Sequence, residues 1–162
     1  MKKTTKKPAA KTVNSTFIKK GAKYKTSAEA LDAITGNTGG KLRLTRADYR
    51  IQSNKSAVFF YLAVQDKNKN WATPPRTQQW INIPENGGKY ICQLNLIDKT
   101  DKKNSYKDKE LAIFMRYFPK GSRNEIFEFY GIYKQKDPVP GSRMFIYLRT
   151  SEKLNIKDWE II

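Results

Sequence analysis

The acidic residues are the first place to look for chemistry, because metal-dependent nucleases hold their metal ions with carboxylates at strand ends. Asp101 and Lys103 have the D-x-K spacing of such a site, but they lie in a polar stretch into which no predicted strand leads. Glu125 and Glu128 lie on or near a predicted strand, where residues three apart point to opposite faces. We therefore expect no catalytic residues, and a metal-dependent nuclease is the least favoured alternative.

The sequence has almost none of the cysteine and histidine residues that bind zinc or act as catalytic bases, and this limits the enzyme classes to which it could belong. Cys92 is the only cysteine among the 162 residues, and the sequence contains no histidine. This excludes an intramolecular disulfide, cysteine–histidine zinc sites and catalysis by a histidine base. Gly39-Gly40 and Gly87-Gly88 are turn dipeptides that lack the following G-K-S/T of a phosphate loop. The sequence predicts neither a metal ion nor another cofactor.

Two short elements resemble the opening of a GIY-YIG nuclease. They are Gly131-Ile132-Tyr133 and Tyr147-Leu148-Arg149. In that family the two elements open the domain, and a catalytic arginine and a metal-binding glutamate follow. Here 31 residues follow Gly131, and the second element lacks the Tyr-Ile-Gly order. We interpret the two elements as adjacent strands, with Gly131 at a bend or at a close approach of a neighbour.

Positive charge dominates the sequence, with 32 lysines and arginines against 15 acidic residues and a net charge of +17. Residues 1–25 contribute nine lysines and no acid, which leaves +8 for the rest of the chain. A basic tail on a basic body favours a polyanionic partner, because binding releases counterions. We expect this partner to be nucleic acid, either DNA or RNA. A lysine-rich surface that serves only solubility is the alternative.

Aromatic rings and cations are interleaved in a way that suits nucleic acid. The segment NWATPPRTQQW places Trp71, Arg76 and Trp80 close together. Bases stack on such rings, and arginine suits the geometry of phosphate. We expect Trp80 to belong to the core and treat Trp71 as a candidate for the ligand surface. The predicted nucleic-acid contacts are Lys2, Lys3, Lys6, Lys7, Lys19, Lys20, Trp71, Arg76, Arg116, Arg143 and Arg149.

An arm, a helix and a set of strands must position these residues. Residues 1–24 are rich in lysine, threonine and alanine, which predicts a flexible basic arm. Residues 26–36 predict a helix, because Thr26 and Glu29 fit a capping box and Gly36 fits a C-cap. Residues 155–162 fit a short helix or a final strand. Apolar–polar alternation and apolar runs predict strands within 41–51, 56–65, 78–83, 89–98, 110–118, 126–135 and 143–150.

The predicted fold class is mainly β (α+β). We expect a small curved β-barrel of about six or seven strands with one N-terminal helix, forming a single domain over residues 25–162. The longest apolar run, residues 57–64, is too short to cross a bilayer, so we expect no membrane partner and a cytoplasmic protein. Six late aromatic residues are expected in the core: Phe127, Phe129, Tyr130, Tyr133, Phe145 and Tyr147.

The C-terminal half resembles two kinds of known domain. The order of its elements is Gln79-Trp80, GGKYI, ELAIFMR, FEFYGIY and PGSRMFIYL. This order is similar to that of a domain at the C-termini of helicases associated with restriction and phage defence. It also resembles the layout of PUA-like readers such as the SRA and EVE domains. The similarity covers roughly residues 74–158, with Trp80, Arg116 and Gly131 at matching positions, and implies a curved barrel that examines modified or flipped bases.

The function predicted from these features is non-catalytic nucleic-acid binding by a lysine-rich arm and a basic, aromatic β-barrel. An alternative from another class is a structural or assembly protein of a phage, mobile-element or ribonucleoprotein particle. In that case the arm would become ordered on RNA or on an acidic protein partner. The choice between DNA and RNA stays open at this stage.

Overall fold

The α-helix begins and ends at the residues that its capping signals predict. The computed structural model describes residues 16–36, 48–65, 71–72, 80–95, 106–137 and 144–161. Within them, α1 spans Ser27–Thr35. The Thr26 side chain accepts a hydrogen bond from Glu29 N at 3.1 Å, and Gly36 ends the helix with a φ of 70°. The predicted helix is confirmed, and its apolar stripe is buried.

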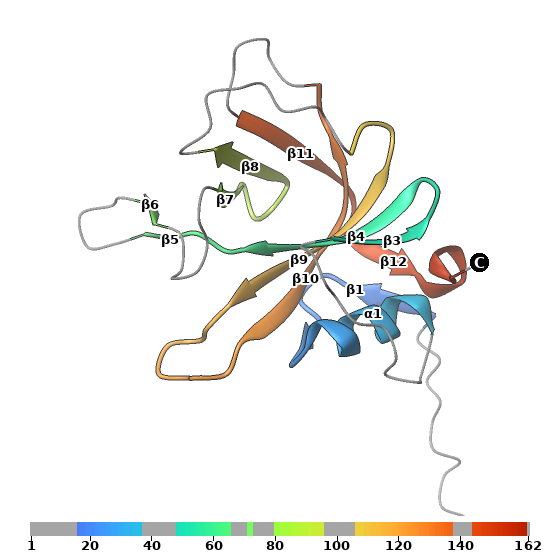
Figure 1. Ribbon diagram of the computed structural model, residues 1–162, viewed down its shortest axis with the longest axis horizontal. Helices are drawn as coiled ribbons and strands as arrows, with labels where there is room; N and C mark the ends of the chain where they lie inside the picture. Colours follow the sequence, from blue (N-terminus) through green and yellow to red (C-terminus); the bar gives the residue numbers. More distant parts are fainter. Residues whose placement is uncertain are drawn as a thin grey trace, which may run out of the picture.

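A strongly curved sheet forms most of the remaining structure (Figure 1). Along the sheet the strands run in the order β3-β4-β9-β10-β11-β8-β7, and β2 pairs with β10 beside this path. Neighbours are antiparallel except β4 and β9, which run parallel. The elements are β1 (Phe17–Lys19), β2 (Lys23–Tyr24), α1, β3 (Asp48–Gln52), β4 (Lys55–Tyr61), β5 (Val64–Gln65), β6 (Trp71–Ala72), β7 (Trp80–Glu85), β8 (Tyr90–Asn95), β9 (Glu110–Tyr117), β10 (Ile126–Gln135), β11 (Met144–Ser151), β12 (Lys153–Asn155) and the 3-10 helix η1 (Ile156–Trp159).

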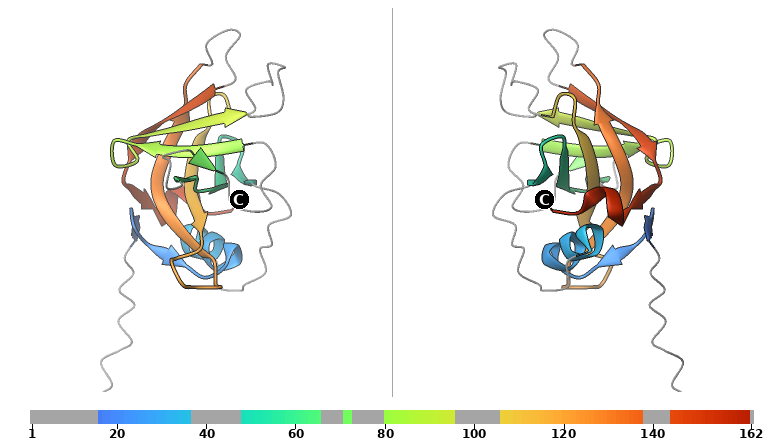
Figure 2. Two further views of the ribbon diagram at one scale, coloured as in Figure 1. Left: turned by 90° about the vertical axis from the view of Figure 1, so that its left-hand side faces the viewer. Right: turned by 90° about the vertical axis from the view of Figure 1, so that its right-hand side faces the viewer.

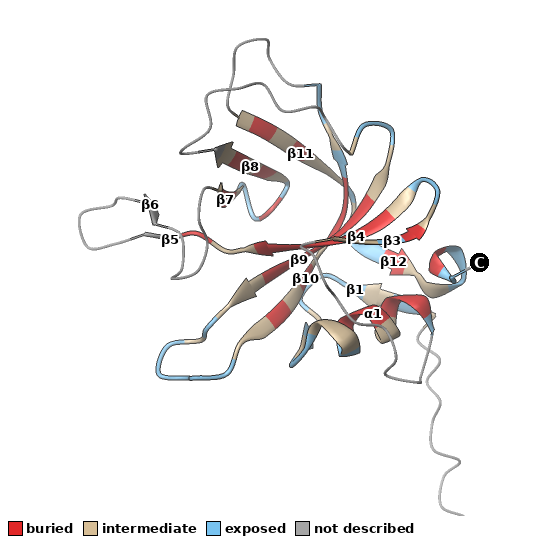
Figure 3. Ribbon diagram, in the orientation of Figure 1, coloured by how far each residue is buried: buried red, intermediate tan, exposed pale blue. Residues whose placement is uncertain are grey.

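Alternation along the strands divides the core between two faces of the sheet. On the helix face, the stacked rings of Phe59 and Phe114, with centroids 5.0 Å apart, belong to the cluster that also contains α1 and Trp159. The inner face is the concave side, where Tyr133 and Tyr147 are buried. Figure 2 shows the curvature, and Figure 3 shows buried residues along both the helix and the strands.

The strand ladder is open. Beyond the end of β4, an isolated parallel bridge joins Leu62 to Asn82 of β7, and Ala63 N donates to Asn82 O at 3.0 Å. The path of paired strands nevertheless has two ends, β3 and β7. A mainly β fold with one α-helix is confirmed, but the closed barrel predicted from the sequence is not, and the main sheet has eight strands instead of six or seven.

The predicted arm over residues 1–24 is too long at its C-terminal end. Residues Phe17–Lys19 form β1, which pairs with β12, and residues Lys23–Tyr24 form β2, which pairs with β10. The lysines hide this from a composition argument, because Ile18 and Tyr24 supply the apolar contacts that dock both strands on the helix-face core. Residues 1–15 lie outside the described part of the chain.

The two aromatic elements that resemble a GIY-YIG opening are neighbouring strands, as predicted. β10 pairs with β11, and Tyr133 stands opposite Arg149. Gly131 has a φ of 133°, and the β10 register shifts between Phe129 and Gly131. The glycine therefore marks both a bulge and a close approach, which confirms its predicted role.

Most of the predicted core aromatics are buried, with two exceptions. Trp80 is half-buried and packs on Phe145 with ring centroids 5.9 Å apart, while Tyr130 is half-buried at the edge of the inner-face core.

The C-terminal residues 156–159 form the 3-10 helix η1, so of the two predicted alternatives the short helix is confirmed and the final strand is not. In the described part of the chain, no helix combines the length and the apolar character needed to cross a membrane.

Candidate nucleic-acid interface

A chain of polar side chains crosses the inner face between apolar residues. Asn82 Nδ2 donates to the backbone oxygen of Tyr61 at 3.1 Å, and Gln93 Nε2 donates to Asn82 Oδ1 at 2.9 Å. The Tyr147 hydroxyl donates to Gln93 Oε1 at 2.8 Å, and Gln135 Nε2 donates to the Tyr147 oxygen at 3.2 Å. We call Asn82, Gln93, Tyr147 and Gln135 the inner polar chain. Strands β7, β8, β11 and β10 each supply one member.

The first acceptor fixes the direction of every bond in the inner polar chain. A backbone carbonyl can only accept, so Asn82 must turn its amide nitrogen toward Tyr61 and its oxygen toward Gln93. The same reasoning orients Gln93, then the Tyr147 hydroxyl, then the amide of Gln135. Gln135 Oε1 is left at the end. It is buried and has no hydrogen-bond partner among the described residues.

Burial keeps Tyr147 in the protonated form that this direction requires. Desolvation raises the pKa of its hydroxyl far above the usual tyrosine value, with Tyr106 adding to the effect and Gln135 opposing it. The hydroxyl therefore donates to Gln93 throughout the physiological pH range. A neutral chain of this kind leaves one unpaired acceptor at its end without placing a charge in the core.

Aromatic rings surround the inner polar chain. The Tyr147 ring lies 5.4 Å from Phe60 and 6.4 Å from Tyr106, and Trp80 packs on Phe145 nearby on the same face. The Tyr106 hydroxyl donates to Asp48 Oδ2 at 3.0 Å, which fixes the ring. Flat apolar rings beside oriented amides are the combination that recognises a planar heterocycle, by stacking and by hydrogen bonds to its edge.

Among the predicted contacts, Lys19 and Lys20 lie exposed at the β1–β12 pair. Lys19 stands directly opposite Lys153, and Lys20 Nζ lies 3.8 Å from the Glu152 carboxylate. Like charges that face each other across two strands repel unless an anion neutralises them. This pair is therefore a candidate place for a phosphate, and a role for Lys19 in nucleic-acid binding stays a prediction.

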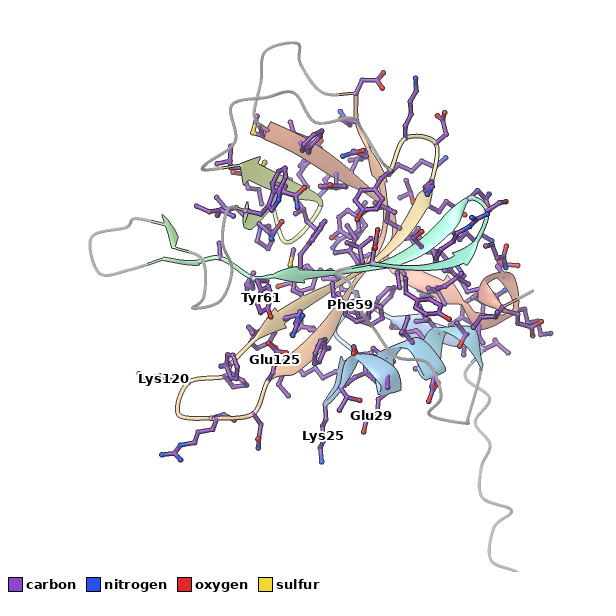
Figure 4. All side chains as sticks on the ribbon, in the orientation of Figure 1. Lys25, Glu29, Phe59, Tyr61, Lys120 and Glu125 are labelled. Atoms are coloured by element: carbon purple, nitrogen blue, oxygen red, sulfur yellow. The ribbon has the colours of Figure 1, made fainter. Side chains whose placement is uncertain are left out.

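Arg116 is engaged by its own neighbours. Its guanidinium donates to Glu125 Oε1 through Nη2 at 2.7 Å and Nε at 3.2 Å, and lies over the rings of Tyr61 at 4.3 Å and Phe127 at 5.0 Å. Figure 4 shows Glu125 beside Tyr61 near the base of the β9–β10 hairpin. A phosphate that bound Arg116, as the sequence predicts, would have to compete with the Glu125 carboxylate.

Arg149 lies on the inner-face side, away from Arg116. Its guanidinium donates to the backbone oxygens of Gly87 at 3.2 Å and Tyr130 at 3.4 Å, and to Glu152 Oε1 at 3.0 Å. The arginine thus ties the β7–β8 turn to β10. The two arginines are not brought together, because β10 separates their strands and they stand opposite different ends of it.

The remaining predicted contacts are placed only in part. Trp71 lies in β6, where its backbone pairs with Gln65, and its side chain is outside the description. Six of the predicted residues fall outside the described residues altogether: Lys2, Lys3, Lys6, Lys7, Arg76 and Arg143.

Sequence reasoning missed the inner polar chain. The signal was present, because Asn82 and Gln93 interrupt the apolar strands WINI and YICQL, and a buried amide is uncommon unless it is hydrogen-bonded. Gln135 and Tyr147 carried no comparable signal, since a polar residue ends many strands and a tyrosine fits an ordinary core. Only the register of β7, β8, β11 and β10 brings the four side chains into line.

Comparison with known proteins gives a likeness in structure. No family model matches the chain, and no curated protein matches its sequence. A solved structure of the 5-hydroxymethylcytosine-specific restriction enzyme AbaSI is similar, with a TM-score of 0.62 and 14% sequence identity. The match covers 86% of this chain and 42% of that one, so the chain spans less than half the length of AbaSI. At this identity the likeness shows the fold alone.

This likeness bears on the resemblance drawn from the sequence. The likeness is one of fold, and the PUA-like, SRA-type resemblance stays a prediction. None of the comparisons supports the resemblance to the helicase-associated domain. Among the described residues, no three histidine, cysteine, aspartate or glutamate side chains lie together as metal ligands.

Proposed function

We propose that this chain is a non-catalytic DNA-binding module that holds a base against the inner polar chain. The observation that carries the proposal is the buried acceptor Gln135 Oε1, which the direction of the chain leaves unpaired and which has no partner among the described residues. A buried acceptor without a donor costs about 1–3 kcal/mol, so its presence favours a donor supplied by a ligand.

The chemistry of the acceptor selects the class of base. An amide oxygen accepts a hydrogen bond from an exocyclic amino group, which cytosine, adenine and guanine carry on their Watson–Crick edges and thymine lacks. The partly exposed rings of Trp80 and Tyr106 would supply stacking. A base can reach such a surface only when it is single-stranded or turned out of the helix. The module would therefore favour an unstacked base that carries an amino group over thymine.

Charge and fold support DNA as the polymer. The net charge of +17 supplies affinity for phosphate whatever the base sequence. The fold is similar to part of a restriction enzyme specific for 5-hydroxymethylcytosine, and this favours DNA over RNA as the partner.

Binding to a matched set of probes tests the proposal. Duplexes would carry one mismatched central cytosine, 5-hydroxymethylcytosine, adenine or thymine, and single-stranded DNA and RNA of the same sequence would be included. Binding is measured at about 50 and about 200 mM salt, a range over which phosphate contacts change the affinity strongly, with and without Mg²⁺. We expect tighter binding to the amino-bearing bases than to thymine, and no cleavage.

A variant isolates the acceptor. Gln135→Met keeps the length of the side chain and removes the amide, so the preference for cytosine or adenine over thymine should disappear while salt-dependent binding remains. Lys134→Met, one residue earlier and exposed, is the matched control and should keep the preference. An unchanged preference in Gln135→Met would refute the base-holding role, and cleavage with Mg²⁺ would establish the nuclease alternative.

A further inference from the structure

The β9–β10 hairpin carries an exposed aromatic side chain at its tip. We call residues 118–124 the hairpin tip. Phe118 is 53% exposed there, whereas the strands on either side bury nearly all of their apolar residues. Figure 1 shows the hairpin extending beyond the body of the protein, and Figure 3 colours most of its tip as exposed. Phe118 therefore gains little hydrophobic stabilisation from folding, and it would gain more if a partner covered its ring.

The hairpin tip is held in a defined shape by its own hydrogen bonds. Ser122 N donates to Pro119 O at 2.9 Å, and Asn124 N donates to Ser122 Oγ at 3.1 Å. Gly121 has a φ of 79°, which the turn requires. An aromatic side chain on a preorganised turn loses little conformational entropy when it binds.

The base of the hairpin is clamped on both sides. Arg116 pairs with Glu125 at 2.7 Å on one side, and the Tyr117 hydroxyl donates to Glu128 Oε1 at 2.6 Å on the other. Both carboxylates next to the hairpin tip are therefore occupied by internal partners. The exposed charges at the tip are the cations Lys120 and Arg123.

A third cation extends this positive surface from the neighbouring strand. Lys23 of β2 stands opposite Glu128, so the lysine lies beside the hairpin base. Lys25 is also exposed, and Figure 4 shows it on the same side of the molecule as Lys120, with Glu29 as the nearest labelled acid. An apolar tip flanked by cations is the surface that proteins use to press a ring between base pairs while lysine and arginine meet phosphates.

We infer that Phe118 is a wedge that inserts between neighbouring base pairs of duplex DNA, with Lys120 and Arg123 on the flanking phosphates. The inference rests on the proposed DNA-binding function. It assigns a second contact, at the opposite end of β10 from Gln135. The 10 residues of β10 lie between the two contacts, which corresponds to about 30 Å of extended strand. That span matches roughly nine base pairs, so both contacts fit on one turn of a duplex.

The test compares full-length wild type with Phe118→Ala, Phe118→Trp and Phe17→Ala. Phe17 is the matched control, because it is another exposed phenylalanine, 44% exposed, on a different strand. Affinity is measured on a duplex of about 20 base pairs, which is long enough for both contacts. Unwinding is measured as the change in linking number when topoisomerase relaxes a plasmid in the presence of the protein.

We expect Phe118→Ala to bind duplex about 5- to 150-fold more weakly and to lose the unwinding, whereas Phe118→Trp and Phe17→Ala keep both. Lys120→Gln with Arg123→Gln should instead lower the salt slope by about 0.9 for each phosphate that the protein no longer neutralises. Duplex binding and unwinding that survive in Phe118→Ala would overturn the wedge and leave the proposed function standing. Wild type that binds no DNA would overturn both. Reduced self-association in Phe118→Ala, with unchanged DNA binding, would overturn the wedge and assign the tip to an interface between copies.

Discussion

Arg149 lies so close to Gly131 that a Cβ atom built on the glycine would be 2.6 Å from Arg149 Cδ. The same atom would also lie 2.6 Å from the backbone oxygen of Ser151. The glycine φ of 133° is a conformation that other residues rarely adopt. The absence of a side chain at residue 131 therefore allows Arg149 to reach the carbonyls of Gly87 and Tyr130.

Gly131→Ala should destabilise the fold by about 2–4 kcal/mol, because backbone strain and overpacking each cost about 1–3 kcal/mol. Gly121→Ala is the control, since it shares a positive φ but has nothing within 4 Å of the added atom. We expect it to cost only about 1–2 kcal/mol. Urea denaturation of both variants measures the difference, and equal losses would contradict the steric argument.

Arg116→Ala should lower the free energy of unfolding by about 1.5–3 kcal/mol, because its charged hydrogen bonds to Glu125 are mostly shielded from water. The two side chains are 22% and 17% exposed. Lys20→Ala, which breaks the 3.8 Å contact with Glu152, should cost at most about 1 kcal/mol, since that pair is exposed. If Arg116→Ala and Lys20→Ala lost similar free energies of unfolding in urea or thermal denaturation, shielding from water would not make the Arg116–Glu125 pair stronger than the exposed pair.

Glu125→Gln separates the structural role of Arg116 from its predicted role in binding. The change weakens the internal pair and leaves the guanidinium free to meet a phosphate. If Arg116 contacts nucleic acid, the variant should bind DNA more tightly and with a steeper salt dependence, by up to about 0.9 for one added phosphate. An unchanged slope in a salt titration would leave Arg116 a purely structural residue.

Alkaline pH should destabilise the protein through Tyr133. Burial raises the pKa of this residue to about 12, against the opposing effect of Arg149, while its unfolded pKa is near 10. The resulting stability is present below about pH 10 and is lost as the pH rises from about 10 to about 12, by up to about 1.4 kcal/mol per pH unit. The Tyr133 hydroxyl donates to Gly88 O, so Tyr133→Phe should be less stable near neutral pH. It should also lose stability more slowly above about pH 10, and parallel curves from urea denaturation would contradict this.

The lysines of residues 1–15 should add to nucleic-acid affinity without adding to stability. Replacing Lys2, Lys3, Lys6 and Lys7 by glutamine should reduce the salt slope by up to about 0.9 for each phosphate that they contact. The melting temperature should stay unchanged. The same number of replacements at Lys107, Lys109, Lys134 and Lys157 keeps the net charge of the variants equal. Equal slopes for the two variants would show that total charge, and not the position of these lysines, determines binding.

The sequence predicted the elements of this fold well where local signals decide them. Thr26, Glu29 and Gly36 define a helix by chemistry that involves only their neighbours, and the limits of β10 follow from an uninterrupted β pattern. The prediction failed at residues 17–24, because these residues form strands only by pairing with strands far away in the sequence. β1 pairs with a strand more than a hundred residues later, and a lysine-rich composition contains no trace of that pairing.

The candidate site was less predictable than the fold for the same reason. Composition indicated a nucleic-acid partner, but Arg116 and Arg149 prove to be tied to internal acceptors, which only the tertiary arrangement reveals. The inner polar chain depends on the register between four strands. A shift of one residue would turn each of its side chains to the opposite face, so no single strand sequence contains the site.

The β1–β12 pair has a consequence for the order of events during synthesis. Ile18 stands opposite Leu154, and Trp159 belongs to the same core cluster as α1. A ribosome adds about 5–20 residues each second, so the helix emerges roughly six seconds or more before the strand and ring that complete its core. During that interval its apolar stripe has no final partner, and a chaperone would meet the nascent chain in that state.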